Sequence, residues 1–345
     1  MHDIADFCFV RLSRHPVRRG GLIALLAVLT LGFGACASRP DDQFAVVSPP
    51  QTFRATSLQT GAQSNSRSEL DDWIRENLLL PKSSQWRQRD PSLLNLNAAS
   101  ALIVDGNGTR LYSKNAAQIK PIASITKLMT AMVVLDAGVP MQTRITIVDA
   151  DRDRLRNSRS RLRINEARLS RGEMIAVAVM SSDNRAAHAL ARTTFRGGTP
   201  AFIDAMNRKA KSLGMHHTHF ADSSGLNGNN RSSAEDLVKL VRAAATYPFI
   251  REITARGEMT VRPFADGTPL RYRNSNPLAR NSDWHLDVSK TGFINEAGYC
   301  LAMQARFDNR PVIMIFLDAS AHWARVSDSR QVRDWLLTGN PASGS

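Results

Sequence analysis

The stretch that most restricts the possible fold is the apolar run after Pro121. Its hydrophobic residues recur at helical spacing, namely at Ile125, Leu128, Met129, Met132, Val133 and Leu135. A helix that is apolar on most of its circumference has to be buried among other layers of structure. With 345 residues, 43% of them hydrophobic, the chain is long enough to supply those layers. We therefore expect this helix inside a globular domain.

Ser124 and Lys127 stand at the start of this helix. Residues three apart in a helix share a face, so the lysine amine lies within reach of the serine hydroxyl. A serine hydroxyl becomes a good nucleophile only when a nearby base takes its proton. Free backbone N–H groups and the positive end of the helix dipole at the same place favour negative charge on a substrate oxygen. The pair is a candidate nucleophile and base, although a Ser-x-x-Lys spacing occurs by chance about once in a chain of this length.

Most predicted strands fall towards the two ends of the domain, and most predicted helices fall between them. Strands are predicted at 101–105, 109–113, 145–147, 259–262, 286–290, 300–305 and 312–317. Helices are predicted at 172–180, 200–213, from Ser232 to about Tyr247, and at 325–337. The glycine-rich link 106–108 joins the first two strands as a hairpin. Short connections between the last strands predict antiparallel pairing.

Two further polar motifs follow Ser124 in the chain. Ser182-Asp183-Asn184 comes directly after an apolar helix. Residues two apart in an extended loop point the same way, so Ser182 and Asn184 are predicted to face one cleft, with Asp183 turned inward. Lys290-Thr291-Gly292 lies in one of the predicted strands.

Together the three motifs resemble those of the penicillin-recognising serine enzymes, the low-molecular-mass penicillin-binding proteins and the serine β-lactamases. The resemblance covers roughly residues 94–340. It implies a β-lactamase/transpeptidase-like fold of the α/β (α+β) class, in which helices flank a five-stranded antiparallel sheet. An all-helical subdomain, roughly residues 121–250, would be inserted, with the active site between it and the sheet.

The resemblance also implies the catalytic roles. Ser124 would be the nucleophile, Lys127 would be its base, and Ser182 would relay a proton to the leaving amine. Lys127 has to be neutral to accept a proton, so its pKa must fall well below the usual value of about 10.4. Desolvation and the neighbouring charge of Lys290 are the expected causes.

Substrate binding is implied for the remaining motif residues. Asn184 would hydrogen-bond the substrate amide, and Lys290 and Thr291 would bind its terminal carboxylate. Gly292 would leave room for the acyl chain to lie along the strand. The backbone N–H groups of Ser124 and Phe293 would form the oxyanion hole.

Two features bear on which member of the family this is. A class A β-lactamase needs a deacylating glutamate after the Ser-Asp-Asn motif, whereas the closest pattern here, Glu166 to Ser170, precedes Ser182. Only 53 residues follow Gly292, too few for the second, all-β domain usual in the carboxypeptidases. The chain therefore looks most similar to D-alanyl-D-alanine endopeptidases of the penicillin-binding protein 7 type, which cut peptidoglycan cross-links.

The alternatives are a D-alanyl-D-alanine carboxypeptidase, a serine β-lactamase and a catalytically inactive wall-binding protein. The residues alone indicate only a serine acyl-transferase or hydrolase.

The N-terminus has the form of an export signal. Basic residues from Arg11 to Arg19 precede an apolar run at 22–33 and the small residues of Ala35-Cys36-Ala37. Cleavage at this A-x-A site would release a soluble protein, whereas lipidation of Cys36 would leave a lipoprotein. We expect residues 1–37 to be the signal, 38–93 to be a polar linker with one short helix at 68–80, and the protein to be periplasmic, soluble or anchored to the outer membrane.

The net charge of +14 falls to about +11 beyond residue 40, a balance that suits polyanionic surroundings. The arginine-rich segment 152–163 is either a solvated loop or a site for an acidic ligand. The sequence lacks the interleaving of arginine with aromatic residues that would favour nucleic-acid binding. His216, His217 and His219 lack acidic or cysteine partners at helical spacing, so neither a metal nor another cofactor is predicted. The expected partners are peptidoglycan peptides and, by resemblance, β-lactams as covalent inhibitors.

Overall fold

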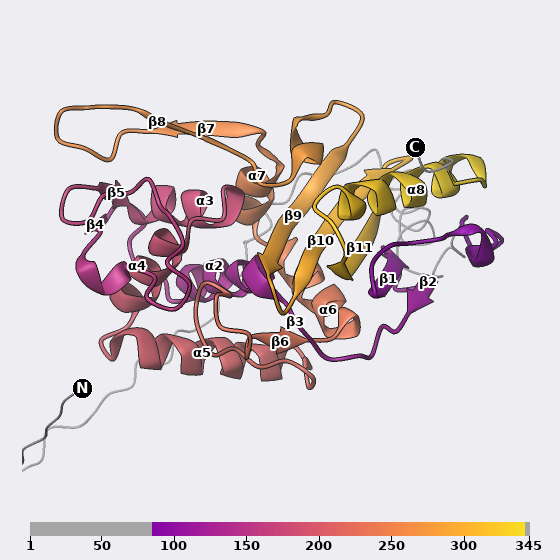
Figure 1. The fold of residues 1–345 in the computed structure, drawn as a ribbon, viewed down its shortest axis with the longest axis horizontal. Coiled ribbons are helices and arrows are strands. Elements are labelled where there is room, and N and C mark those ends of the chain that lie inside the picture. Colours follow the sequence, from indigo (N-terminus) through magenta and orange to yellow (C-terminus); the bar gives the residue numbers. More distant parts are fainter. Residues whose placement is uncertain (1–84, 342–345) are drawn as a thin grey trace, which may run out of the picture. The chain divides into compact units, whose positions relative to one another are not determined.

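The computed structural model describes residues 85–341 (Figure 1). The predicted signal at 1–37, the predicted helix at 68–80 and the linker as far as residue 84 lie outside the described residues. Between residues 85 and 341, no helix combines the length and the apolar character that crossing a membrane requires.

A five-stranded sheet in the order β2-β1-β11-β10-β9 forms the centre of this part of the chain. The strands are β1 (Ser100–Asp105), β2 (Arg110–Lys114), β9 (His285–Ile294), β10 (Gly298–Phe307) and β11 (Arg310–Ala319). All neighbouring pairs are antiparallel, and β1 pairs with β11. The predicted hairpin and the predicted C-terminal strands therefore join in one sheet, as expected.

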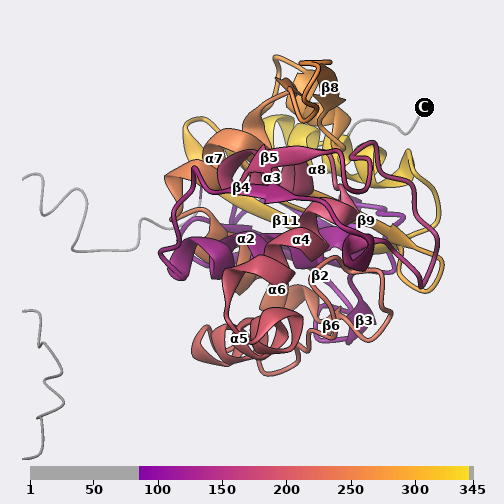
Figure 2. The same ribbon diagram turned by 90° about the vertical axis from the view of Figure 1, so that its left-hand side faces the viewer.

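Helices occupy the chain between β2 and β9. They are α2 (Thr126–Asp136), α3 (Arg171–Met180), α4 (Asn184–Thr194), α5 (Gly198–Ser212), α6 (Ala234–Ala244) and α7 (Pro248–Ala255), and α8 (Ala324–Thr338) follows the last strand. Figure 1 shows α3, α4 and α5 grouped around α2, away from α8, and Figure 2 shows α2, α3 and α4 together above α5. This arrangement is the predicted α+β architecture with an inserted helical region.

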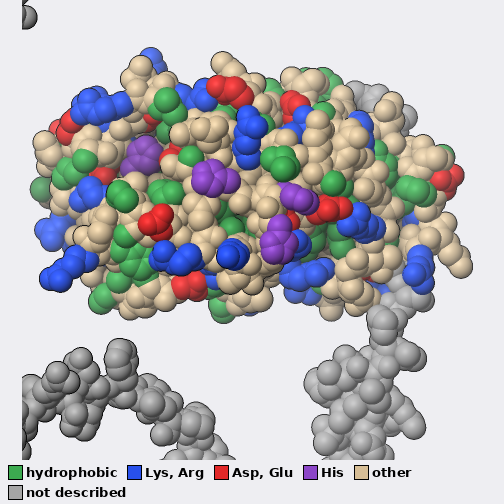
Figure 3. All heavy atoms as spheres, turned by 90° about the horizontal axis from the view of Figure 1, so that it is seen from below, with side chains coloured by type: hydrophobic (Ala, Val, Ile, Leu, Met, Phe, Trp, Pro, Cys, Tyr) green, Lys and Arg blue, Asp and Glu red, His purple; other side chains and the backbone are tan. Residues whose placement is uncertain are grey.

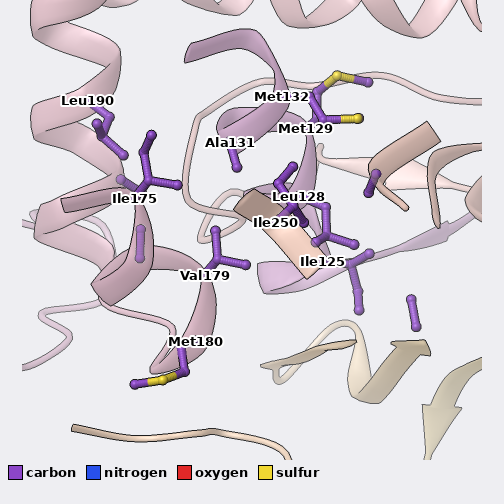
Figure 4. Packing of buried hydrophobic residues seen from close by; sticks show 14 of the residues in the cluster. Ile125, Leu128, Met129, Ala131, Met132, Ile175, Val179, Met180, Leu190 and Ile250 are labelled. Carbon is purple, nitrogen blue, oxygen red and sulfur yellow. The ribbon is translucent and has the colours of Figure 1, made fainter. Parts of the chain in front are cut away.

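The apolar helix after Pro121 is α2, and it is buried as predicted. All residues from Thr126 to Val134 are buried. Figure 4 shows Leu128 and Met132 of α2 in the same hydrophobic cluster as Ile175 of α3, Leu190 of α4 and Ile250 of α7. The neighbouring helices thus hold the start of α2, and with it Ser124, in one place.

Alternate residues of the sheet face two separate hydrophobic clusters. Ile313 and Ile315 of β11 belong to the cluster of the helical region. Met314 and Phe316 pack on the opposite face with Trp335 of α8. Trp86 and Leu94 belong to this second cluster, so the packed part of the chain includes residues before the predicted domain start at 94.

The short strands form three two-stranded ribbons outside the main sheet. They are β3 (Lys120–Pro121) with β6 (Arg231–Ser232), β4 (Arg144–Thr146) with β5 (Arg168–Ser170), and β7 (Glu258–Val261) with β8 (Leu270–Arg273). The predicted strand at 259–262 is β7, which pairs with β8 and not with the central sheet. The N-terminal cap of α6 is Ser233, which accepts a hydrogen bond from Asp236 N, one residue beyond Ser232, where the helix was predicted to start.

Charged side chains are mixed on the face seen in Figure 3. Lys and Arg side chains are interspersed there with Asp, Glu and neutral groups. Several arginines of segment 152–163 have local partners: Arg152 and Arg154 pair with Asp149, and Arg163 pairs with Glu166. Because these ion pairs are exposed to solvent, much of segment 152–163 is a solvated basic loop.

Candidate active site

The three motifs meet at one cleft of about 720 Å³. The residues lining it are Ser124, Leu155, Arg156, Ser158, Ser182, Asn184, Leu226, Ser275, Thr291, Gly292, Phe293, Ile294, Asn295, His322 and Arg325. Lys127 and Lys290 are buried, with 0% and 1% of their surface exposed. The structure thus brings together every residue that the sequence proposed for the site.

Ser124 lies in a short 3-10 helix, η2 (Ala123–Ile125), directly before α2. Ala123 adopts a φ of 45°, a left-handed conformation that costs energy in a residue other than glycine. Two glycines let other segments approach this backbone. A Cβ on Gly225 would lie 1.9 Å from Ala123 O, and one on Gly292 would lie 2.9 Å from Ile122 O. The room left by Gly292 is therefore taken by η2, whereas the sequence interpretation assigned it to the acyl chain.

Lys127 Nζ is surrounded by three oxygen atoms. It lies 2.8 Å from Ser124 Oγ, 2.7 Å from Asn184 Oδ1 and 2.6 Å from Ser224 O. A neutral amine has two hydrogens and one lone pair. The amide and carbonyl oxygens can only accept hydrogen bonds, so they take the two hydrogens. The lone pair is then left for the hydroxyl proton of Ser124, which is the geometry of a nucleophile and its base.

The ionisation of Lys127 suits a base. Burial is the largest influence and lowers its pKa to about 7, against the opposing charges of Asp222, Asp183 and Asp153. Lys290 is not among the causes, although the sequence interpretation named it. Burial also lowers the pKa of Lys290, and the charges of Lys127 and Arg325 lower it further. The low dielectric of the site, more than repulsion between the two lysines, keeps the Lys127 amine available as a base.

Ser182 reaches the cleft from a tight connection between α3 and α4. Its φ is 66°, and Asn184 is already the first residue of α4, so the connection is not the extended loop that was predicted. Asp183 is buried, as predicted, because it caps α4 by accepting from Ala186 N and also accepts a hydrogen bond from Ser160 Oγ. The two helix ends, and not strand-like alternation, turn Ser182 and Asn184 toward one cleft.

Lys290 connects the second and third motifs. Its amine donates to Ser182 Oγ at 2.9 Å and to Thr291 O at 2.9 Å. Thr291 Oγ1 donates to Ser275 Oγ at 2.8 Å. A proton can therefore move between Lys290 and Ser182 across a single hydrogen bond.

The sequence interpretation missed three groups at the cleft. Ser224 contributes its backbone carbonyl to Lys127, a contribution that no side-chain motif can reveal. Arg325, at the start of α8, is 4% exposed and donates to Gly292 O and Cys300 O. Arg156 donates to Leu226 O and to Glu296, so one arginine of segment 152–163 does belong to the cleft.

Other candidate groups lie elsewhere. Glu166 forms an ion pair with Arg163 at the surface, and no Asp or Glu is among the residues lining the cleft in the described part of the chain. His219 takes part in an isolated β-bridge with Arg231. Within residues 85–341, no group of three or more His, Cys, Asp or Glu side chains is arranged to hold a metal ion.

Comparison with known proteins identifies the family. A family model described as D-alanyl-D-alanine carboxypeptidase matches residues 86–321. The chain belongs to the D-alanyl-D-alanine carboxypeptidase family. Members of this family are serine D,D-peptidases, and this assignment confirms both the resemblance drawn from the three motifs and the prediction of a serine peptidase.

The relatives of this family member carry two names. A D-alanyl-D-alanine endopeptidase of Escherichia coli is 42% identical over 245 residues, which cover 70% of this chain and 78% of that protein. A Pseudomonas aeruginosa protein of the same name is also 42% identical over 245 residues, covering 71% of this chain and 78% of that protein. A D-alanyl-D-alanine carboxypeptidase of a Streptomyces species is 30% identical over 248 residues, covering 67% of this chain and 84% of that protein.

Solved structures confirm the predicted fold of this D-alanyl-D-alanine carboxypeptidase family member. The Streptomyces K15 DD-transpeptidase is 28% identical and superimposes with a TM-score of 0.66 over 70% of this chain and 98% of its own. Penicillin-binding protein D2 of Listeria monocytogenes, in its cefotaxime-bound form, is 30% identical, with a TM-score of 0.60 over 71% of this chain and 99% of its own.

Gly292 gives a direct test of the packing around Ser124. We expect Gly292→Ala to slow acylation by a fluorescent penicillin by roughly tenfold to a hundredfold, because its Cβ would displace η2 and with it the nucleophile. Gly172→Ala is the matched control, since a Cβ at that position of α3 meets nothing closer than an ordinary contact of 3.5 Å with Met141 Cε. Equal labelling rates for both variants would show that β9 and η2 do not need this close contact.

Proposed function

We propose that the protein is a D-alanyl-D-alanine endopeptidase that cleaves the peptide cross-links of peptidoglycan through an acyl-enzyme on Ser124. The observation that carries this proposal is the arrangement at Lys127, whose amine has two fixed acceptors and lies 2.8 Å from Ser124 Oγ. Its pKa of about 7 leaves a large neutral fraction near neutral pH.

Acylation proceeds in two steps. Ser124 Oγ attacks the carbonyl carbon of the scissile amide while Lys127 takes the hydroxyl proton, and the carbonyl oxygen becomes an oxyanion. The backbone N–H groups of Ser124 and Phe293 hold that oxyanion. When the C–N bond breaks, the leaving amine receives a proton from Ser182 Oγ, which Lys290 then replaces. Water then attacks the ester carbonyl and loses a proton that restores Lys290, and Lys127 returns its proton to Ser124 Oγ as the ester bond breaks.

The remaining motif residues bind the peptide. Asn184 Nδ2 donates to Ser158 Oγ at 2.8 Å, which fixes the amide plane beside the substrate chain. Lys290 and the Thr291 hydroxyl supply donors for a substrate carboxylate, and the Arg325 guanidinium lines the same cleft. Peptidoglycan stem peptides carry such carboxylates, so the cationic character of this wall suits them.

We choose endopeptidase over carboxypeptidase because of the names and sequence identities of the relatives. Proteins named endopeptidase are 42% and 38% identical to this chain, whereas those named carboxypeptidase are 30% identical or less. The test incubates the purified protein with cross-linked muropeptide dimers and, separately, with pentapeptide monomers. We expect monomers to appear from the dimers. If the dimers survive while the pentapeptides lose alanine, the protein is a carboxypeptidase.

β-Lactams are proposed as covalent inhibitors. A penicillin places a strained amide where the peptide carbonyl would lie, and Ser124 would open it by the same route. The amine of the opened ring stays attached to the acyl group, where the hydrolytic water would otherwise enter, and no Asp or Glu among the described residues lining the cleft could activate a water from another side, so the adduct should persist. A β-lactamase would instead release its product within the assay.

Export is part of the same proposal, since peptidoglycan lies outside the cytoplasm. Residues 1–37 would direct the protein to the periplasm, and the residues from 38 onward would form a linker that ends before Trp86, where the packing of the catalytic domain begins. The mature protein would be either soluble or lipidated at Cys36. The intact mass of the protein recovered from cells separates these forms, and a mass that includes residues 1–37 would contradict export with cleavage.

A further inference from the structure

A turn formed by residues 222–230 packs against the segment that carries Ser124 and Lys127. Ser224 O accepts from Lys127 Nζ at 2.6 Å and lies 3.4 Å from Ser124 Oγ. Ser223 O accepts from Thr130 Oγ1, one turn further along α2, at 2.6 Å. Asn230 O accepts from Ile122 N at 3.0 Å. The 222–230 turn therefore touches this segment before, at and after the nucleophile.

The carboxylate of Asp222 holds this turn together. Its Oδ1 accepts from Ser224 N at 2.6 Å, from Gly225 N at 2.5 Å and from Asn230 Nδ2 at 3.0 Å. Its Oδ2 accepts from Asn227 N at 2.6 Å. Hydrogen bonds to a charged acceptor are stronger than those between neutral groups, so these contacts fix the direction of the Ser224 carbonyl.

We infer that Asp222 is a positioning residue for the catalytic pair: it orients the Ser224 carbonyl that directs the Lys127 lone pair toward Ser124, and its negative charge acts on the Lys127 amine. This inference rests on the proposed roles of Ser124 and Lys127. Asp222 itself touches neither group through its side chain.

The geometry explains why a carboxylate is needed at this position. Three N–H donors of the turn, from Ser224, Gly225 and Asn227, point to the two oxygens of one side chain. An amide at residue 222 offers only one oxygen, and its NH2 group would face the Asn227 N–H. A neutral replacement of the same size would thus let the turn relax and the Ser224 carbonyl swing away from Lys127.

The charge of Asp222 has a second, separable consequence. Asp222 is the first of three carboxylates whose charge raises the pKa of Lys127 against the effect of burial, the others being Asp183 of the second motif and Asp153 of segment 152–163. Lys290 of β9, whose own pKa is lowered by burial and by the charge of Lys127, is a neighbouring basic group, and His188 Nε2 of α4 lies 3.1 Å from Ser224 Oγ. Removing the Asp222 charge therefore lowers the pKa of Lys127, so the neutral base persists to lower pH.

The test measures the rate of acylation by a fluorescent penicillin over a pH range that spans 7, for the full-length protein, Asp222→Asn and Asp222→Glu. For Asp222→Asn we expect the maximal rate to fall by roughly tenfold to a hundredfold and the midpoint of the acidic limb to move to lower pH. Asp222→Glu keeps the charge but moves the carboxylate, so its maximal rate should fall while its midpoint stays near that of the wild type.

Asp266→Asn is the matched control. The Asp266 carboxylate also organises a turn, because it accepts hydrogen bonds from Thr268 N and Thr268 Oγ1, but that turn lies at the surface and is far from the three motifs in sequence. Partial unfolding would lower the maximal rate without moving the midpoint. The inference is overturned if Asp222→Asn leaves the midpoint of the acidic limb unmoved or the maximal rate unreduced. If Asp222→Asn does not fold, a wild-type maximal rate in Asp222→Glu overturns it. If the wild type forms no adduct that depends on Ser124, the proposed function fails, which is a distinct outcome.

Discussion

Ser124→Ala should abolish cleavage of cross-linked muropeptides, with a fall in rate of at least about ten-thousandfold. The reason is chemical: alanine has no atom that can form the acyl-enzyme, and among the described residues that line the cleft no other hydroxyl is hydrogen-bonded to Lys127. Ser124 Oγ is the hydroxyl that faces both Lys127 Nζ and the Ser224 carbonyl. The measurement is release of monomers from dimers, followed by chromatography.

The control for Ser124→Ala is Ser212→Ala, which removes an exposed hydroxyl whose hydrogen bond within the described residues goes to Lys209 O at the end of α5. Both variants should unfold at temperatures close to that of the wild type, because Ser124 Oγ makes few contacts outside the site. Residual cleavage by Ser124→Ala near the wild-type rate would exclude the acyl-enzyme on this serine.

Lys127→Met should lower the acylation rate by roughly a hundredfold to ten-thousandfold, the usual contribution of a general base. Methionine keeps most of the volume of the buried side chain but cannot accept the Ser124 proton. In the wild type, the rate should fall as the pH drops below about 7, because the pKa of Lys127 is lowered to about 7 and only the neutral amine is a base. That acidic limb should disappear from whatever rate the variant retains.

Lys211→Met is the matched control, since Lys211 is an exposed lysine of α5. It should keep both the wild-type rate and the acidic limb with its midpoint near 7. A Lys127→Met protein that is acylated at the wild-type rate would show that another group removes the Ser124 proton.

The sequence predicted most of the site because the three motifs are made of side chains with fixed spacing. Ser124 in η2 and Lys127 in the first turn of α2 are three residues apart on consecutive helical turns, and Lys290 and Thr291 share a strand, so local periodicity suffices to place each pair. The five-stranded sheet was also predictable, since its strands have strong apolar runs and short connections. The identity of the family then followed from the order of the motifs.

The parts that escaped prediction depend on tertiary contacts. Ser224 acts through its backbone carbonyl, so its residue type gives no signal. Arg325 is adjacent to the cleft only because α8 packs beside β10, far along the chain from Ser124. The need for glycine at position 292 depends on how closely η2 approaches it, which the sequence does not show. The lowered pKa of Lys127 depends on the burial of its amine, which is also a tertiary property. Segment 248–255 was not predicted as a helix, because its eight residues give too short a pattern.

The most direct test of the whole account is mass spectrometry of the protein after exposure to a penicillin. The account predicts one penicillin added per chain, stable over the assay, with the added mass on the peptide that contains Ser124 and absent from Ser124→Ala. An adduct on another residue, or no adduct on a folded wild-type protein, would contradict the assignment of Ser124 as the nucleophile of a serine D,D-peptidase.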